Sequence, residues 1–235
     1  MYIKGTVLIG LVTMLVSACL TAPEFPNEPS LSFNNIIFKK GGSEFSIDTL
    51  ILTMNFRDGD GDLGLNPDGD DLLDPFHEFW VFTKDDGSGD YVTLADFGKP
   101  GFEILPPYEF PYSCINYSTI IENDTFYTEP NIYHHNIYVD FFVKKNGIYT
   151  EFDWSAINQP ACNPNYDGRF PLLNESLRDR PLEGKLKYKM QSVGFDLLFR
   201  DDSLKLEFYI YDRAHNKSNV VSTPDFVLKS ITVGG

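Results

Sequence analysis

Residues 136–154, NIYVDFFVKKNGIYTEFDW, decide the fold class of this chain. Apolar and polar side chains alternate on both sides of Asn146-Gly147, as they do in β-strands that bury one face. An Asn-Gly pair between two such runs is the strongest short-range signal for a two-residue hairpin. The stretch therefore predicts an antiparallel β-hairpin.

Similar alternation continues on both sides of this hairpin, and no long helical period interrupts it. The further runs lie at 31–39, 45–56, 77–84, 91–94, 185–193, 204–211 and 220–232. The pattern of the first run indicates a β-bulge. About eight strands with turn signals between them predict an all-β fold, an antiparallel immunoglobulin-like sandwich with Trp80 as its core tryptophan.

The chain of 235 residues is short enough to form one all-β domain, which we expect at residues 31–235. The stretch at about 100–181 is too long for a loop between two strands of one sandwich. We therefore expect a long loop and hairpin insertion there.

The first eighteen residues have the features of a signal peptide. Lys4 supplies the positive charge, and the uncharged apolar run at 5–16 is too short to span a bilayer. Small residues then precede Cys19, and the run LVSAC at 15–19 resembles a bacterial lipoprotein lipobox. The resemblance implies cleavage before Cys19 and acylation of that cysteine, whereas the alternative is an ordinary secretory signal followed by a chance cysteine.

Acyl chains on Cys19 would anchor the protein to a membrane permanently. Leu20 stands where an inner-membrane lipoprotein would carry Asp, which favours the outer membrane, on either its periplasmic or its extracellular face. Residues 19–30 contain Pro23, Pro26 and Pro29 and no periodic pattern, so they predict an extended tether.

The charge balance excludes some classes of partner. With 34 acidic and 19 basic side chains, the chain has a net charge of −15. Nucleic-acid binding requires clustered Lys and Arg, and polybasic attachment to anionic lipid requires the same. We therefore expect neither. The sequence also contains no nucleophile elbow, phosphate-binding loop or zinc-protease motif, so we expect a protein that is not an enzyme.

The chain has three cysteines. Lipidation would consume Cys19 and leave Cys114 and Cys162, and an exported pair without a competitor is most simply a disulfide.

The densest motif is DGDGDLGLNPDGDD at 58–71. Asp58, Asp60 and Asp62 have a spacing that lets successive carboxylates converge on one hard cation, and the glycines between them permit a tight turn. The loop differs from an EF-hand, because Leu63 stands in place of the usual glycine and no acidic residue occupies the twelfth position. It predicts a calcium loop of another kind; the alternative is a solvated acidic loop without metal.

A second motif, YIYDRAHNKSN at 209–219, is similar to the turn before the last strand in many bacterial immunoglobulin-like domains. His215 stands where that turn usually has glycine. The loop after the second strand and the loop before the last strand lie at the same end of a sandwich. The predicted cation ligands are therefore Asp58, Asp60, Asp62, Asp68, Asp70 and Asp212.

These motifs, together with RFPLL at 169–173 and LEG at 182–184, resemble the uncharacterised outer-membrane lipoproteins common in Bacteroidota. The resemblance implies a cell-envelope lipoprotein with a β-sandwich. We expect a lipid-anchored protein with a non-catalytic binding or accessory role, whose partner is a glycan or an envelope protein. The alternatives are a carbohydrate-active hydrolase that uses loop carboxylates and a structural subunit of an outer-membrane complex.

Overall fold

The computed structural model describes residues 24–42, 46–119, 124–157, 165–175, 179–192 and 194–233. The predicted signal peptide, Cys19 and Cys162 lie outside these residues. Within them, no helix is both long enough and apolar enough to cross a membrane.

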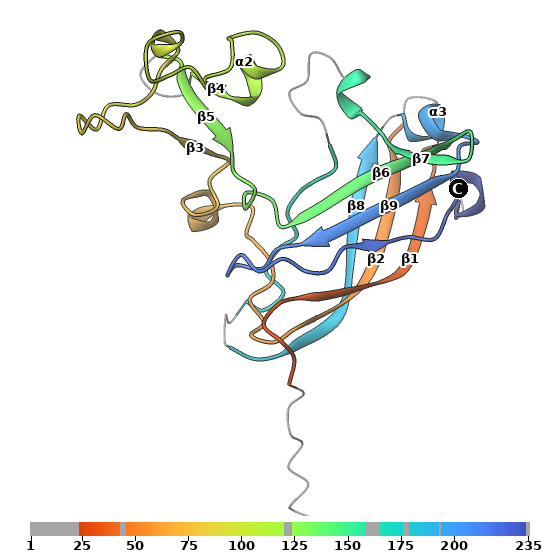
Figure 1. Cartoon of the computed structure of the whole chain (residues 1–235). Helices are drawn as coiled ribbons and strands as arrows, with labels where there is room; N and C mark the ends of the chain where they lie inside the picture. Colours follow the sequence, from red (N-terminus) through yellow and green to blue (C-terminus); the bar gives the residue numbers. More distant parts are fainter. Residues whose placement is uncertain are drawn as a thin grey trace, which may run out of the picture.

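Two antiparallel sheets form a sandwich (Figure 1). The first has the order β1-β2-β8, from β1 (Ser30–Lys39), β2 (Asp48–Asp58) and β8 (Leu182–Ser192). The second has the order β10-β9-β6-β7, from β10 (Val221–Ser222), β9 (Leu204–Ile210), β6 (Ile137–Lys145) and β7 (Ile148–Glu151). The described chain is therefore mostly antiparallel β-structure, as predicted.

The core lies between these sheets and follows the alternation in the sequence. On β6 and β9, every second residue is buried, and the other residues face solvent. The short helix α3 (Phe195–Phe199) closes one end with Phe195 and Phe199, which stack on Phe141 of β6. Burying each such side chain contributes roughly 1.5–3 kcal/mol, so this shared core stabilises the sandwich.

A third, smaller sheet lies beside the sandwich (Figure 1). It has the order β3-β5-β4, from β3 (Phe79–Val81), β5 (Phe126–Pro130) and β4 (Tyr117–Ser118), and the helix α2 (Tyr112–Ile115) precedes β4. Its own small core contains Val92, Leu105, Tyr117 and Tyr127. In the sequence, this additional sheet is inserted between β2 and β6.

Two local predictions are confirmed. The hairpin between β6 and β7 has positive φ at Asn146 (53°) and Gly147 (83°), as a two-residue turn of this kind requires. The register of β1 against β2 shifts between Phe33 and Asn35, which is the predicted bulge.

The insertion differs from the prediction in its bounds. The additional sheet starts at Phe79, before the expected limit of about 100. The hairpin expected inside the insertion belongs to the four-stranded sheet, because β6 pairs with β9 over its length, from Ile137 with Ile210 to Val143 with Leu204. The apolar face of β6 is thereby buried in the main core.

The prediction that Trp80 is the core tryptophan was also wrong. Trp80 is 37% exposed and lies on β3, which pairs with β5 outside the sandwich. The buried tryptophan is Trp154, which packs edge-on against Phe141 at a ring distance of 5.0 Å. The fourth sandwich strand, β7, pairs with β6, whereas in constant-type immunoglobulin domains it joins the other sheet. The immunoglobulin-like subtype therefore stays a prediction.

Candidate metal centre

The acidic loop begins where β2 ends. Asp58 is the last residue of β2 and is fully buried, and its Oδ2 accepts a hydrogen bond from the Asp62 amide at 3.1 Å. Gly61 lies between them with φ of 73°. This backbone conformation is easily reached only by glycine, so Gly61 brings Asp62 back toward Asp58.

A neighbouring segment holds the loop in place. The amide of Arg180 donates to the Asp60 carbonyl, and the amide of Leu173 donates to the Leu63 carbonyl, both at 3.0 Å. The approach is so close that a Cβ on Gly61 would lie 2.3 Å from the Arg180 carbonyl oxygen. The loop is therefore a packed part of the fold rather than a freely solvated turn.

The second motif forms a turn after β9. The Asp212 carboxylate accepts hydrogen bonds from the Asn216 amide at 2.7 Å and the Asn216 side chain at 2.8 Å. His215 has φ of 68°, which explains why glycine suits this position. Its ring stacks on Tyr133 at 3.8 Å, a contact that glycine would not provide. The turn thus fixes the Asp212 carboxylate.

The two motifs meet. Asp58, Asp62 and Asp212 each contribute an oxygen atom to a group whose atoms all lie within 4.8 Å of one another. Asp62 joins the loop to the turn, because its Oδ2 accepts from the Ala214 amide at 2.9 Å. Within the described chain, the buried Oδ1 atoms of Asp58, Asp60 and Asp62 have no hydrogen-bond partner. Such an unpaired buried oxygen is costly unless a cation or a water satisfies it.

Burial and mutual repulsion perturb the cluster. Burial, followed by the charges of Asp60, Asp62 and Asp212, raises the pKa of Asp58 to about 7. Burial and the charges of Asp212 and Asp60 raise the pKa of Asp62 to about 6. Burial also raises the pKa of Asp212. Bound protons or a cation would relieve this repulsion.

Of the three other predicted ligands, Asp60 is outside this group, but its charge acts on Asp58 and Asp62. The remaining two lie apart from the group. Asp68 and Asp70 are exposed, at the start of the 3-10 turn η1 (Gly69–Leu72). The next residue, Asp71, is buried and forms an ion pair with Arg213 at 2.8 Å. Asp71 therefore fastens η1 to the same turn that carries Asp212. The sequence spacing did not reveal this pair, because the two residues are 142 positions apart.

Arg169 was also missed as an organising residue. Its guanidinium donates to the carbonyls of His134 (2.6 Å), Asp71 (2.7 Å) and Phe76 (2.8 Å). These carbonyls belong to the segments that lead into and out of the additional sheet. Arg169 therefore ties that sheet to the end of the sandwich that carries the cluster.

A groove lies between α2 and the strands β6 and β7. It has a volume of about 640 Å³, and its acidic lining residues are Asp140, Glu151, Asp153 and Asp167. Burial raises the pKa of Asp167 to about 6 and also raises the pKa of Asp140. Phe110, which is 46% exposed, lines the groove from the side of the additional sheet.

Tyrosines can stack on sugar rings, but the five tyrosines discussed next do not form one platform for such a ligand. Tyr117 and Tyr127 are buried in the small core, and Tyr133 is covered by His215. Tyr108 and Tyr112 are exposed near α2. Cys114 lies on α2, but its predicted partner Cys162 is outside the described residues, so the disulfide stays a prediction.

Comparison of the chain with family models, curated proteins and solved structures found no significant match.

Proposed function

We propose that this chain is an exported lipoprotein, anchored through Cys19 to the outer membrane, with a calcium ion that stabilises its loop end and a non-catalytic binding or accessory role. The observation that carries the calcium proposal is the convergence of Asp58, Asp62 and Asp212 with unpaired buried oxygens on Asp58 and Asp62. The anchor rests on the lipobox-like sequence before Cys19 and on the tether that follows it.

Calcium suits this donor set better than other common ions. The ligands are all oxygens, which excludes the thiolate and imidazole sets that zinc prefers. Asp60 supplies a further buried oxygen beside the three clustered carboxylates. Calcium accepts six to eight oxygens in a flexible arrangement, whereas magnesium requires near-ideal octahedral geometry. Backbone carbonyls and water would complete the shell.

A thermal melt with calcium or chelator tests the proposal. A ligand that binds only the native state stabilises it by about 2.7 kcal/mol at a hundredfold excess over its Kd. For a domain of this size, that corresponds to a rise in Tm of roughly 5–10 °C. Extracellular modules typically bind calcium at about 10⁻⁴–10⁻³ M, so the titration should extend to about 10 mM.

Variants locate the effect. Asp60→Ala and Asp58→Asn should each abolish the rise in Tm, because each removes a carboxylate whose buried, unpaired oxygen would bind the ion. Asp68→Asn and Asp70→Asn are the matched controls, since both residues are exposed acids of the same loop outside the cluster. An unchanged melt of the wild-type chain at saturating calcium would leave the loop as an acidic turn without metal.

A carbohydrate-active hydrolase is the second candidate, and the groove beside α2 favours it. Asp167 and Asp140 are two carboxylates with raised pKa values in one groove, and their charges interact. A carboxyl group with a pKa near 6 can protonate a glycosidic oxygen, while a second carboxylate activates water. Asp167 would be the acid and Asp140 the base.

Release of reducing sugar from a panel of envelope and plant polysaccharides tests this candidate. Activity that is lost in both Asp167→Asn and Asp140→Asn, but kept in the exposed-site control Asp201→Asn, would establish it. Equal activity in all four proteins would assign the signal to a contaminant.

A further inference from the structure

A row of lysines lies on the outer face of the β1-β2-β8 sheet. On β8, Leu186 and Met190 point into the core. Because side chains alternate along a strand, Lys185, Lys187 and Lys189 all point outward, and each of them is exposed. The three ammonium groups therefore lie along the sheet at intervals of roughly 6.6 Å.

No carboxylate lies opposite these lysines in the sheet. Their direct partners on β2 are Asn55, Thr53 and Ile51, and the residues beyond them on β1 are Ser32, Asn35 and Ile37. Within the described chain, none of the three lysines forms an ion pair. This is unexpected in a chain with 34 acidic and 19 basic side chains.

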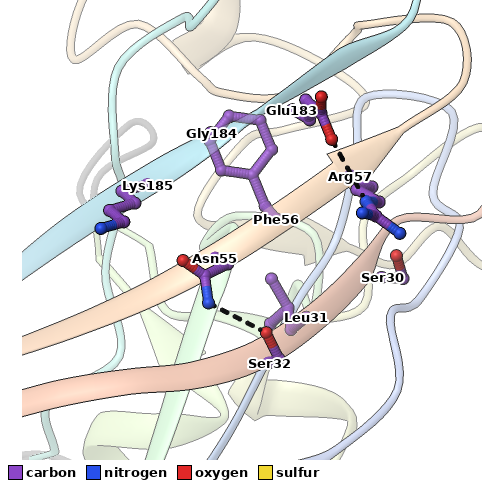
Figure 2. A pocket seen from close by; sticks show the side chains of 9 residues that line it. All are labelled: Ser30, Leu31, Ser32, Asn55, Phe56, Arg57, Glu183, Gly184 and Lys185. Atoms are coloured by element: carbon purple, nitrogen blue, oxygen red, sulfur yellow. Dashed lines mark hydrogen bonds and ion pairs between the residues drawn. The ribbon is translucent and has the colours of Figure 1, made fainter. Parts of the chain in front are cut away.

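The row ends in a hollow rich in hydrogen-bond donors. The hollow has a volume of about 640 Å³, and Figure 2 shows the side chains that line it. Lys185, Arg57, Asn55 and the hydroxyls of Ser30 and Ser32 supply the donors. Its one carboxylate, Glu183, is already paired with Arg57 at 3.3 Å. This lining suits an anionic group such as a phosphate.

The same hollow lies where the tether joins the domain. Ser30 lines the hollow and is the first residue of β1, and the Arg57 guanidinium lies 5.5 Å from the ring centre of Phe25 in the tether. The twelve residues from Cys19 to Ser30 span at most about 40 Å when extended. An anchored chain therefore keeps this face within reach of the lipid headgroups.

We propose that the outer face of the β1-β2-β8 sheet, with Lys185, Lys187 and Lys189 at its centre, rests on the anionic headgroup phosphates of the membrane. The proposal rests on the lipid anchor of the proposed function. The net charge of the whole chain argues against polybasic attachment, but the fold separates the charges. Carboxylates on other faces are screened beyond about 8 Å at physiological salt, whereas the lysine row would contact the surface directly.

Chemical modification of the lysine side chains with an amine-specific reagent, carried out on the lipidated protein, tests this orientation. The protein is reconstituted in vesicles of phosphatidylcholine alone or mixed with phosphatidylglycerol, and modified lysines are quantified by peptide mapping. Three lysines at about 1 kcal/mol each favour the proposed orientation by on the order of 100-fold. The reactivity of Lys185, Lys187 and Lys189 should therefore fall at least about tenfold on anionic vesicles and recover in 1 M salt. Lys99, Lys145 and Lys229 are exposed controls on other elements, and their reactivity should not change.

Equal reactivity of the three β8 lysines on both kinds of vesicle would overturn the proposal. A second outcome would also overturn it: a soluble acidic polysaccharide protects these lysines on neutral vesicles, while anionic lipid has no effect. That outcome would assign the face to a glycan. A second measurement does not depend on the anchor. The Cys19→Ser chain should float with anionic vesicles, and the K185Q/K187Q/K189Q variant should float less than the equally charged K99Q/K145Q/K229Q variant. If the wild-type protein failed to float with neutral vesicles, this result would bear only on the lipidation of Cys19.

Discussion

The Asp58 carboxylate has one oxygen that is satisfied by the Asp62 amide and one that has no partner among the described residues. The residue is fully buried at the end of a core strand, where an uncompensated negative charge is expensive. Its own loop and the Asp212 turn bring further carboxylates close to it. A fold that places carboxylates in this way needs protons or a cation to offset their repulsion, and at neutral pH a cation serves better.

The calcium effect should depend on pH in a defined direction. The pKa of Asp58 rises from its ordinary 3.8 to about 7 on folding, and that of Asp62 rises to about 6. The folded state therefore holds more protons than the unfolded chain between about pH 4 and pH 7, so without calcium these groups lower stability as the pH rises through this window. Calcium requires the deprotonated carboxylates, so we expect its effect on Tm to be small at pH 5 and largest at pH 8.

The measurement is the difference in Tm between calcium and chelator at each pH. This difference cancels the titration of groups that do not bind the ion, including His135, whose pKa burial lowers to about 4. A calcium effect of the same size at pH 5 and pH 8 would show that Asp58 and Asp62 are not the ligands.

At the scale of elements, the loop after β2 depends on close backbone packing. Gly61 has φ of 73°, and a Cβ there would lie 2.3 Å from the Arg180 carbonyl oxygen. Gly87 has a similar φ of 78°, but open space surrounds it. Gly87→Ala should therefore cost only the conformational strain, about 1 kcal/mol of stability. Gly61→Ala should cost at least about 2 kcal/mol more, because the backbone at Arg180 must also move.

Urea unfolding of the two variants measures this contrast. Gly61→Ala should also weaken the calcium effect, because the turn that returns Asp62 to Asp58 would shift. Equal losses of stability in the two variants would mean that the loop is not packed against the backbone at Arg180.

The elements that could be predicted are those with a strong local signal. The β6–β7 hairpin follows from Asn146-Gly147 and the alternation around it, and the bulge in β1 follows from a break in the alternation. The assignment of each hairpin to a sheet could not be predicted in the same way. It depends on which strand lies beside it, and β6 pairs with β9 from about 60 residues further along the chain.

The candidate site was predicted to a similar extent. The spacing of Asp58, Asp60 and Asp62 and the position of Asp212 indicated one end of a sandwich, and the structure brings Asp58, Asp62 and Asp212 together. Asp68 and Asp70 could not be separated from these by spacing alone, because all of them lie in one acidic loop. The 3-10 turn η1, which the Asp71–Arg213 ion pair holds in place, carries Asp68 and Asp70 outside the cluster.

At the scale of the whole molecule, the predicted disulfide would join two parts of the chain. Cys114 lies on α2 in the additional sheet region, and Cys162 follows β7 in the sequence. Closing this loop of about 49 residues would stabilise the fold by at most about 4 kcal/mol. Non-reducing peptide mapping of exported protein should recover a Cys114–Cys162 crosslink, and reduction should lower Tm. Free alkylation of both thiols in the folded protein would exclude the bond.

The position of the molecule in the cell depends on Cys19. Several acyl chains make membrane attachment effectively permanent, since each buried CH₂ contributes about 0.8 kcal/mol. Cys19→Ser should therefore release the domain from membranes or leave it unprocessed, whereas Cys162→Ser should remain attached. Fractions are washed in 1 M salt before measurement, because the proposed lysine face would hold some unlipidated protein on anionic membranes at low salt. Unchanged association of Cys19→Ser with salt-washed membranes, without detergent, would show that acylation is not the anchor.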